Sequence, residues 1–170
     1  MVLDPLPLTV ANARTERLFM NLPLGVALKN FLGVYVLTPF EEHLLDRLKK
    51  ALAPEDKEIL SFQLAHFTTT RRLTRHLDVP NAHGFTNFHT LRFGKDVSAE
   101  RQTKRFPSNE PHAVLATAQV VLDGGTIEVK FVLVRGVLFR IEYRSPQKIY
   151  YPPADYRLES ISVWPGGRSS

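Results

Sequence analysis

The stretch from His112 to Arg144 reads HAVLATAQVVLDGGTIEVKFVLVRGVLFRIEYR. It contains three runs rich in β-branched and aromatic residues, separated by turn dipeptides at Asp123-Gly124 and Arg135-Gly136. Runs of this kind with turns between them are typical of strands joined by hairpins. The stretch therefore predicts a meander of three antiparallel strands over about 113–144.

The side chains also predict how these strands pair, because a shift of one residue exchanges the two faces of a strand. A two-residue turn at Asp123-Gly124 gives the first hairpin one apolar face. In the second hairpin we favour the register that sets opposite charges across the strands over a three-residue loop ending on Gly136, which sets like charges together. The expected pairs are Val120–Ile127, Ala118–Val129, Ala116–Phe131 and Val114–Leu133, then Leu133–Phe139, Phe131–Ile141, Val129–Tyr143, Lys130–Glu142 and Glu128–Arg144.

The reverse face of the meander is only half polar, because it also carries apolar residues, Val132 and Leu138 among them. These residues would form a second, smaller layer of core under a loop or helix, or else an exposed apolar patch that binds a protein. The solvent exposure of Val132 and Leu138 separates the two interpretations.

A helix is predicted directly after Thr38, which suits the N-cap position. Pro39 stands at the first helical position and Glu41 completes a capping box. Leucines at helical spacing follow, so we expect this helix to cover the apolar face of the meander and Leu48→Asp to unfold the domain. A short helix over 58–60 and further strands near 61–70, 86–93 and 157–164 complete the prediction.

The predicted fold class is α+β, with N-terminal helices packed on one face of an antiparallel sheet. The length of 170 residues suits a single domain over 1–170, with an extended segment at 1–12 and a flexible tail at 165–170. No apolar run approaches the roughly 18 residues of a transmembrane helix, and the first residues show no secretory signal, so we expect a cytoplasmic protein without membrane contact. The chain has no cysteine, which excludes disulfides and thiolate metal ligands.

The positive charge is concentrated in the middle of the chain. The net charge is +5, and residues 61–111 hold eight Lys/Arg against four Asp/Glu, a local excess of four. Such an asymmetry favours an anionic partner, for instance a nucleic acid. The residues that would contact it are Arg71, Arg72, Arg75, Lys104 and Arg105. Arg92, Lys95 and Arg101 supply further positive charge, and Phe85, Phe88, Phe93 and Phe106 lie among them as possible stacking rings.

Five of the six histidines lie between His66 and His112. His76, Asp78, His83 and His89 could together hold a metal ion, although their spacing matches no known metal-site pattern. Alternatively, His76 or His83 oriented by Asp78 could act as a general base. No phosphate-binding glycine loop or nucleophile elbow accompanies them, so no reaction type and no cofactor is predicted.

A protein-binding module is the function that the sequence favours. The domain is small, and Tyr150 and Tyr151 lie in a Pro-rich segment that could supply rigid aromatic anchors to a partner protein, together with Val132 and Leu138. Nucleic-acid binding and a histidine- or metal-dependent enzyme are the alternatives.

Overall fold

The computed structural model describes residues 36–74, 83–93, 95–98, 103–108, 110–122, 125–144 and 155–169. The extended segment expected at 1–12 lies outside the described residues. Two helices precede a series of strands in the described part of the chain. The elements are α3 (Pro39–Ala51), α4 (Pro54–His66), β1 (Thr69–Thr74), β2 (His83–His89), β3 (Leu91–Arg92), β4 (Lys95–Asp96), β5 (Ala113–Leu122), β6 (Gly125–Val134), β7 (Val137–Arg144) and β8 (Arg157–Ser169).

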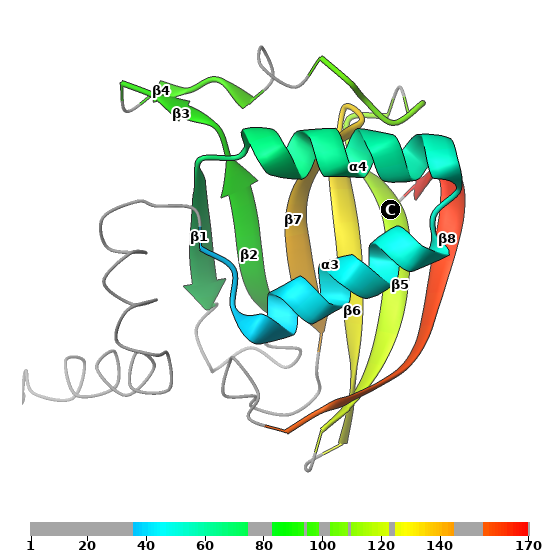
Figure 1. Ribbon diagram of the computed structural model, residues 1–170. Coiled ribbons are helices and arrows are strands. Elements are labelled where there is room, and N and C mark those ends of the chain that lie inside the picture. Colours follow the sequence, from blue (N-terminus) through cyan, green and yellow to red (C-terminus); the bar gives the residue numbers. More distant parts are fainter. Residues whose placement is uncertain are drawn as a thin grey trace, which may run out of the picture.

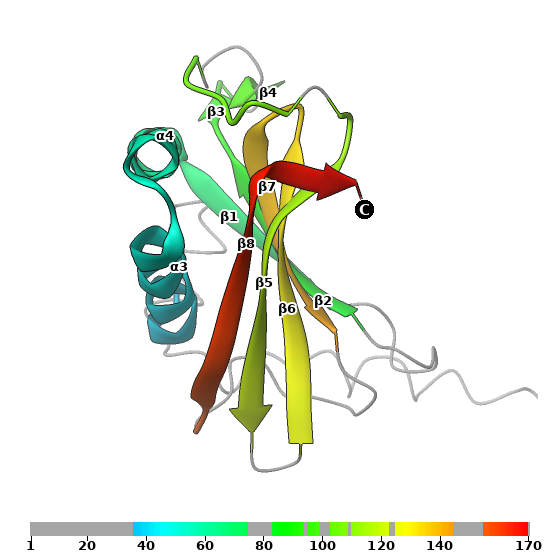
Figure 2. The ribbon, with the colours of Figure 1, turned by 90° about the vertical axis from the view of Figure 1, so that its right-hand side faces the viewer.

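The six longer strands form one antiparallel sheet in the order β1-β2-β7-β6-β5-β8, while β3 and β4 form a separate two-stranded hairpin. Helices α3 and α4 lie across one face of this sheet (Figures 1 and 2). The expected fold class, α+β with N-terminal helices on one face of an antiparallel sheet, is therefore confirmed. The small hairpin and residues 103–108 and 110–112 lie at the end of the sheet nearest α4 (Figure 1).

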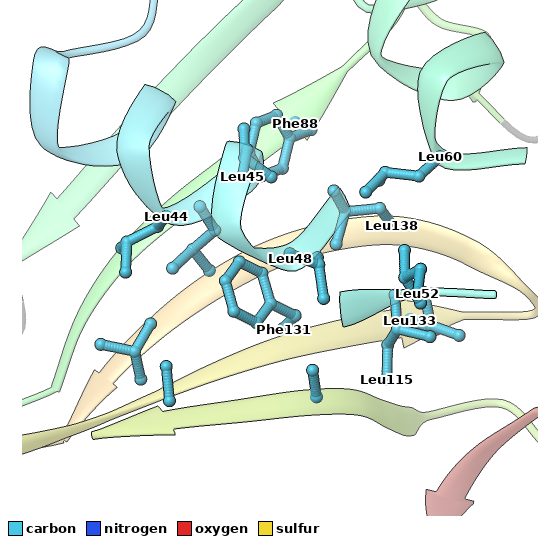
Figure 3. Packing of buried hydrophobic residues seen from close by; sticks show 14 of the residues in the cluster. Leu44, Leu45, Leu48, Leu52, Leu60, Phe88, Leu115, Phe131, Leu133 and Leu138 are labelled. Atoms are coloured by element: carbon cyan, nitrogen blue, oxygen red, sulfur yellow. The ribbon is translucent and has the colours of Figure 1, made fainter. Parts of the chain in front are cut away.

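Helix α3 begins as its sequence predicts. The Thr38 side chain accepts a hydrogen bond from the N–H of Glu41, and the Glu41 carboxylate accepts one from the N–H of Thr38, which completes the capping box. Leu44, Leu45 and Leu48 then lie fully buried against the sheet. Figure 3 shows these leucines in the same buried cluster as Phe88 of β2 and Phe131 of β6. Burial stabilises the fold by roughly 1.5–3 kcal/mol for each such side chain.

The strands of the meander pair as expected along most of their length. Val120 lies opposite Ile127, Ala118 opposite Val129 and Ala116 opposite Phe131 in the first hairpin. In the second, Phe131 pairs with Ile141, Val129 with Tyr143, Lys130 with Glu142 and Glu128 with Arg144.

Near the turn at Arg135-Gly136 the expected register was wrong in two places. Leu133 pairs with Ala113 and Leu138, not with Val114 and Phe139, because the register shifts between Val114 and Ala116 and between Val132 and Leu133. A bulge of this kind places two consecutive residues on one side of a strand. It brings Leu115 and Leu138 into the core, where both are fully buried.

Residues 61–66 were expected to begin a strand and are helical. The alternation of Phe62, Leu64 and His66 suggested a strand, but α4 starts at Pro54 with acidic residues in its first turn and buries Leu60 and Gln63, which are one turn apart. This short segment fits both the alternation of a strand and the spacing of a helix, and burial against the rest of the domain decided for the helix. The expected strand begins after this helix, as β1.

None of the described helices is long and apolar enough to cross a membrane.

The last strand is longer than expected. The sequence predicted a strand near 157–164 and a tail at 165–170, whereas β8 includes residues up to Ser169, which pairs with Ala113 of β5. The register shifts between Val163 and Arg168, around Pro165 and two glycines. At this point β8 bends away from the helices (Figure 2).

Candidate functional site

An exposed phenylalanine stands at the tip of the β3–β4 hairpin. The pairs Leu91–Asp96 and Arg92–Lys95 leave a two-residue turn that begins with Phe93, and the Phe93 side chain is 94% exposed. Its φ of 50° lies in the left-handed region, which is uncommon for a bulky residue. The Arg92 guanidinium carbon lies 5.7 Å from the centroid of the Phe93 ring, within the range of a cation–π contact. We call Arg92, Phe93 and Lys95 the hairpin tip.

The base of this hairpin is fixed by polar contacts. Asp96 Oδ2 lies 2.6 Å from Nδ1 of His89, and Asp96 Oδ1 accepts hydrogen bonds from the N–H and the hydroxyl of Ser98. Partial burial on its own raises the pKa of Asp96, but the hydrogen bonds from Ser98 and His89, with the charge of His89, lower that pKa below its usual range. The Thr90 hydroxyl donates to the His66 carbonyl at 2.9 Å, which joins the hairpin to the end of α4.

The segment 103–108 lies beside the turn between β6 and β7. Lys104 pairs with Glu58 of α4, and the hydrogen bond and charge from Lys104 lower the pKa of that carboxyl. The Arg105 guanidinium donates to the Arg135 carbonyl at 3.4 Å. Arg105, Phe106, Ser108, Pro111 and Arg135 line a hollow of about 430 Å³.

Arg72, which the sequence placed in a nucleic-acid contact, belongs instead to the interior of the domain. Its side chain is 11% exposed and pairs with Glu41, a fully buried residue in the first turn of α3. The Glu41 carboxylate also accepts a hydrogen bond from the Thr86 hydroxyl at 2.5 Å. The prediction for Arg72 was wrong because the strand alternation turns this side chain toward the helix.

The remaining basic candidates are separated. Arg71 is exposed on β1, Lys104 and Arg105 lie near the β6–β7 turn, and Arg75 lies outside the described residues. Among the four rings, Phe88 and Phe106 are buried and Phe85 is half-buried, so Phe93 alone of these four is exposed.

The histidine and aspartate candidates are not brought together in the described part of the chain. His76 and Asp78 lie outside it, and of His83 only the backbone in β2 is described. His89 contacts Asp96, as set out above, and the ring of Phe139. Among the residues that the structure describes, no group of three His, Asp or Glu side chains could hold a metal ion.

Val132 and Leu138 do not form an exposed patch. Val132 is 7% exposed and Leu138 is fully buried, because the bulge in the second hairpin turns Leu138 into the core. Both residues are thereby removed as contacts for a partner. Tyr150 and Tyr151, the other two expected contacts, lie outside the described residues.

The sequence indicated Phe93 as a possible stacking ring, but it did not indicate the left-handed turn positions of Phe93 and Arg135. They are the two described residues other than glycine with positive φ, each at 50°, and each begins a two-residue hairpin turn followed by glycine. The sequence contains a signal for these positions, because two-residue hairpin turns favour Asn-Gly or Asp-Gly and this chain has Phe-Gly and Arg-Gly instead.

The described residues form an α+β domain, with α3 and α4 on one face of a six-stranded antiparallel sheet and the hairpin tip, Arg92, Phe93 and Lys95, at one end. Comparison of the chain with protein-family models, curated proteins and solved structures gave no match.

Proposed function

We propose that this chain is a cytoplasmic, non-catalytic module that binds another protein through the hairpin tip. The observation that carries the proposal is Phe93, an aromatic side chain that is 94% exposed in a left-handed turn position. A left-handed backbone conformation destabilises an ordinary residue by roughly 1–2 kcal/mol. An exposed ring buries little apolar surface on folding, so hydrophobic burial offsets little of that strain. Backbone strain and solvent exposure at the same residue support a role of Phe93 in binding and not in stabilising the fold.

The chemistry of the hairpin tip suits a protein partner. Aromatic and arginine side chains are enriched among the residues that dominate binding energy at protein interfaces. Arg92 and Lys95 form the strand pair next to the turn that carries Phe93, so the pocket that receives Phe93 should be apolar with an acidic rim. The contacts of Asp96 with His89 and Ser98 hold the hairpin before binding, which lowers the entropy lost on association.

Nucleic-acid binding is the second candidate, because the same three residues could stack on a base and contact its phosphate. The stacked arrangement of Arg92 over Phe93 favours it. The other basic candidates give nucleic-acid binding less support, since Arg72 and Lys104 each have a carboxylate partner within the chain. An enzyme using His76 and Asp78 gains no support from the described residues.

The test is a pull-down from native lysate with the full tagged chain, with and without nuclease. We compare wild type, Phe93→Asn and Phe93→Tyr. Asn suits the left-handed turn and removes the ring, whereas Tyr keeps a ring at the same strained position. We expect one stoichiometric protein that survives nuclease, is retained by Phe93→Tyr and is lost with Phe93→Asn.

Two outcomes contradict the proposal. If the Phe93→Asn chain retains the same protein in full, the hairpin tip is not the contact. If the retained material is nucleic acid, or proteins that nuclease releases, the second candidate replaces the first.

A further inference from the structure

We infer that the sheet face opposite the helices binds an acidic segment of a protein through Arg71 and Arg140. Arg71 of β1 lies directly opposite Asn87 of β2, and Asn87 lies directly opposite Arg140 of β7. We call these three residues the arginine row. The inference deepens the proposed function and rests on it in taking a protein as the partner.

The side chains of the arginine row share the face of the sheet that points away from α3 and α4. Their neighbours along the strands turn to the other face: Arg72 pairs with Glu41 of α3, and Phe88 and Ile141 are buried in the core. Successive side chains of a strand point to opposite faces, so the row faces away from both described helices (Figure 2).

Two aromatic rings hold Arg140 over the neighbouring strand. Its guanidinium carbon lies 5.2 Å from the ring centroid of Phe85 and 4.9 Å from that of Phe139, within the range of a cation–π contact. Phe85 belongs to β2, which lies between β7 and β1, so Arg140 leans toward Arg71. Two strand spacings separate the Cα atoms of the arginines by roughly 10 Å, so both can contact one bound segment.

Two atoms of the row are buried without a hydrogen-bond partner, Nε of Arg140 and Oδ1 of Asn87. A buried polar group without a partner destabilises a fold, so each such group calls for a reason other than folding. A peptide group offers a carbonyl that accepts from Arg140 and an N–H that donates to Asn87. A bound segment can therefore satisfy both atoms once the Arg140 side chain shifts to meet it.

The charges of this face give the segment its class. The carboxylates of β6 and β7 that share the face are paired already, Glu142 with Arg144 and Glu128 with Lys130. In the part of the chain that the structure describes, neither Arg71 nor Arg140 has a carboxylate or hydrogen-bond partner. A guanidinium matches a carboxylate with two parallel hydrogen bonds, so aspartate or glutamate side chains complement the row.

The rings of this face favour an acidic peptide over a nucleic acid. Single-stranded nucleic acids bind by stacking their bases on exposed aromatic faces. Here the Arg140 guanidinium lies over both Phe85 and Phe139, and both rings are half-buried. Little ring surface remains for a base, whereas carboxylates need only the guanidinium groups.

The test is fluorescence anisotropy of the full chain with a labelled hexaglutamate peptide at about 0.1 M salt, where distant charges are screened. A hexaglutamine peptide and a single-stranded oligothymidine are the comparison probes. We expect saturable binding of the hexaglutamate peptide and none of the hexaglutamine peptide. Arg71→Gln and Arg140→Gln should each weaken the binding by about three- to tenfold.

Failure of this inference is distinguishable from failure of the proposed function. The titration probes the arginine row without a pocket for Phe93, whereas the pull-down compares Phe93 variants with the row intact. A pull-down that depends on Phe93, together with no hexaglutamate binding, overturns the arginine row alone. Hexaglutamate binding, together with a pull-down that does not depend on Phe93, overturns the hairpin tip alone.

The variants separate binding from folding. Arg71 is exposed, so Arg71→Gln should keep its melting temperature and carries the test even if Arg140→Gln, which loses two ring contacts, is less stable. Arg157→Gln, on the opposite edge strand β8 and with a side chain 76% exposed, removes the same charge and should bind like wild type. The inference is overturned if hexaglutamate does not saturate, or if Arg157→Gln weakens binding as much as Arg71→Gln. It is also overturned if oligothymidine binds more tightly than hexaglutamate and depends on the same two arginines.

Discussion

Glu41 shows how one residue can serve both a helix and the core. Its carboxylate accepts hydrogen bonds from the N–H of Thr38 at 2.7 Å, from the Arg72 Nε at 3.0 Å and from the Thr86 hydroxyl. It is fully buried, and these donors occupy both of its oxygens. We therefore assign the Glu41–Arg72 pair to the structure of the domain and not to a reaction.

We expect Glu41→Ala to lower the free energy of unfolding by about 3–5 kcal/mol, because it leaves Arg72 nearly buried without its partner. Urea denaturation measures this loss. The double variant Glu41→Ala/Arg72→Met should lose less than the two single variants together. Glu42→Ala, exposed in the same helical turn, is the control and should change stability by less than about 1 kcal/mol. A strictly additive double variant contradicts the pairing.

At the two strained turn residues, Phe93 and Arg135, we expect substitution to keep or raise the stability, in contrast to the loss expected for Glu41→Ala. Phe93→Asn and Arg135→Asn should each leave the free energy of unfolding unchanged or raise it by up to about 1 kcal/mol, because Asn adopts the left-handed backbone more readily than Phe or Arg. Thermal denaturation followed by circular dichroism measures the change. A clear loss of stability in both variants would mean that these side chains are needed for folding.

At the scale of elements, Gln63 joins α4 to the end of the sheet. Its amide nitrogen donates to the carbonyls of Lys104 and Gly136 at 2.9 and 3.0 Å, and its oxygen accepts from the N–H of Leu138 at 2.8 Å. All three partners are backbone groups, so one buried side chain fixes a helix, a strand and a loop together. This contact positions the hollow next to Arg135.

We expect Gln63→Leu to lower the free energy of unfolding by about 2–4 kcal/mol. The variant has a similar volume but removes the acceptor of the Leu138 N–H and the Gln63 donor to the Lys104 carbonyl, while the Gly136 carbonyl keeps its hydrogen bond from the Phe106 N–H. Chemical denaturation gives the loss, and Lys57→Leu, exposed on the same helix, serves as the control. Equal stability of Gln63→Leu and wild type would show that water replaces these hydrogen bonds.

The β3–β4 hairpin should respond to acid through Asp96. The folded pKa of this carboxyl is lowered, so its stabilising effect is fully present above its unfolded pKa of about 3.9 and is lost as the pH falls through the folded pKa. NMR titration should place the midpoint of Asp96 below that of an aspartate in an unfolded peptide, with the Phe93 amide changing at the same midpoint. Asp96→Asn should abolish that change at Phe93, and a midpoint that is not lowered contradicts the assignment.

At the scale of the whole molecule, both helices and the sheet share one core. Leu48 of α3, Leu60 of α4 and Phe131 of β6 are fully buried in the same cluster (Figure 3). We expect a shared core to give one cooperative unit, because no element can unfold without exposing the apolar side chains of the others to water.

We expect a single unfolding transition. Far-UV circular dichroism, which follows the helices, and the fluorescence of Trp164, the one tryptophan of the chain, should give the same midpoint in urea. Leu48→Ala should lower the free energy of unfolding by about 2–5 kcal/mol and move both midpoints equally. Separate midpoints would show that α3 and β8 belong to different cooperative units.

The sequence by itself determined the elements whose signals are local. The capping box at Thr38 and Glu41 needs only neighbouring residues, and the alternation in 113–144 specifies the strands and most of their pairs. Tertiary structure decided the rest, because burial depends on partners distant in the chain. It made 61–66 helical, turned Leu138 into the core and gave Arg72 a buried partner, while Phe93 remained exposed. The contact that joins the β3–β4 hairpin to the end of α4, between Thr90 and His66, also links distant residues, and local patterns do not contain it.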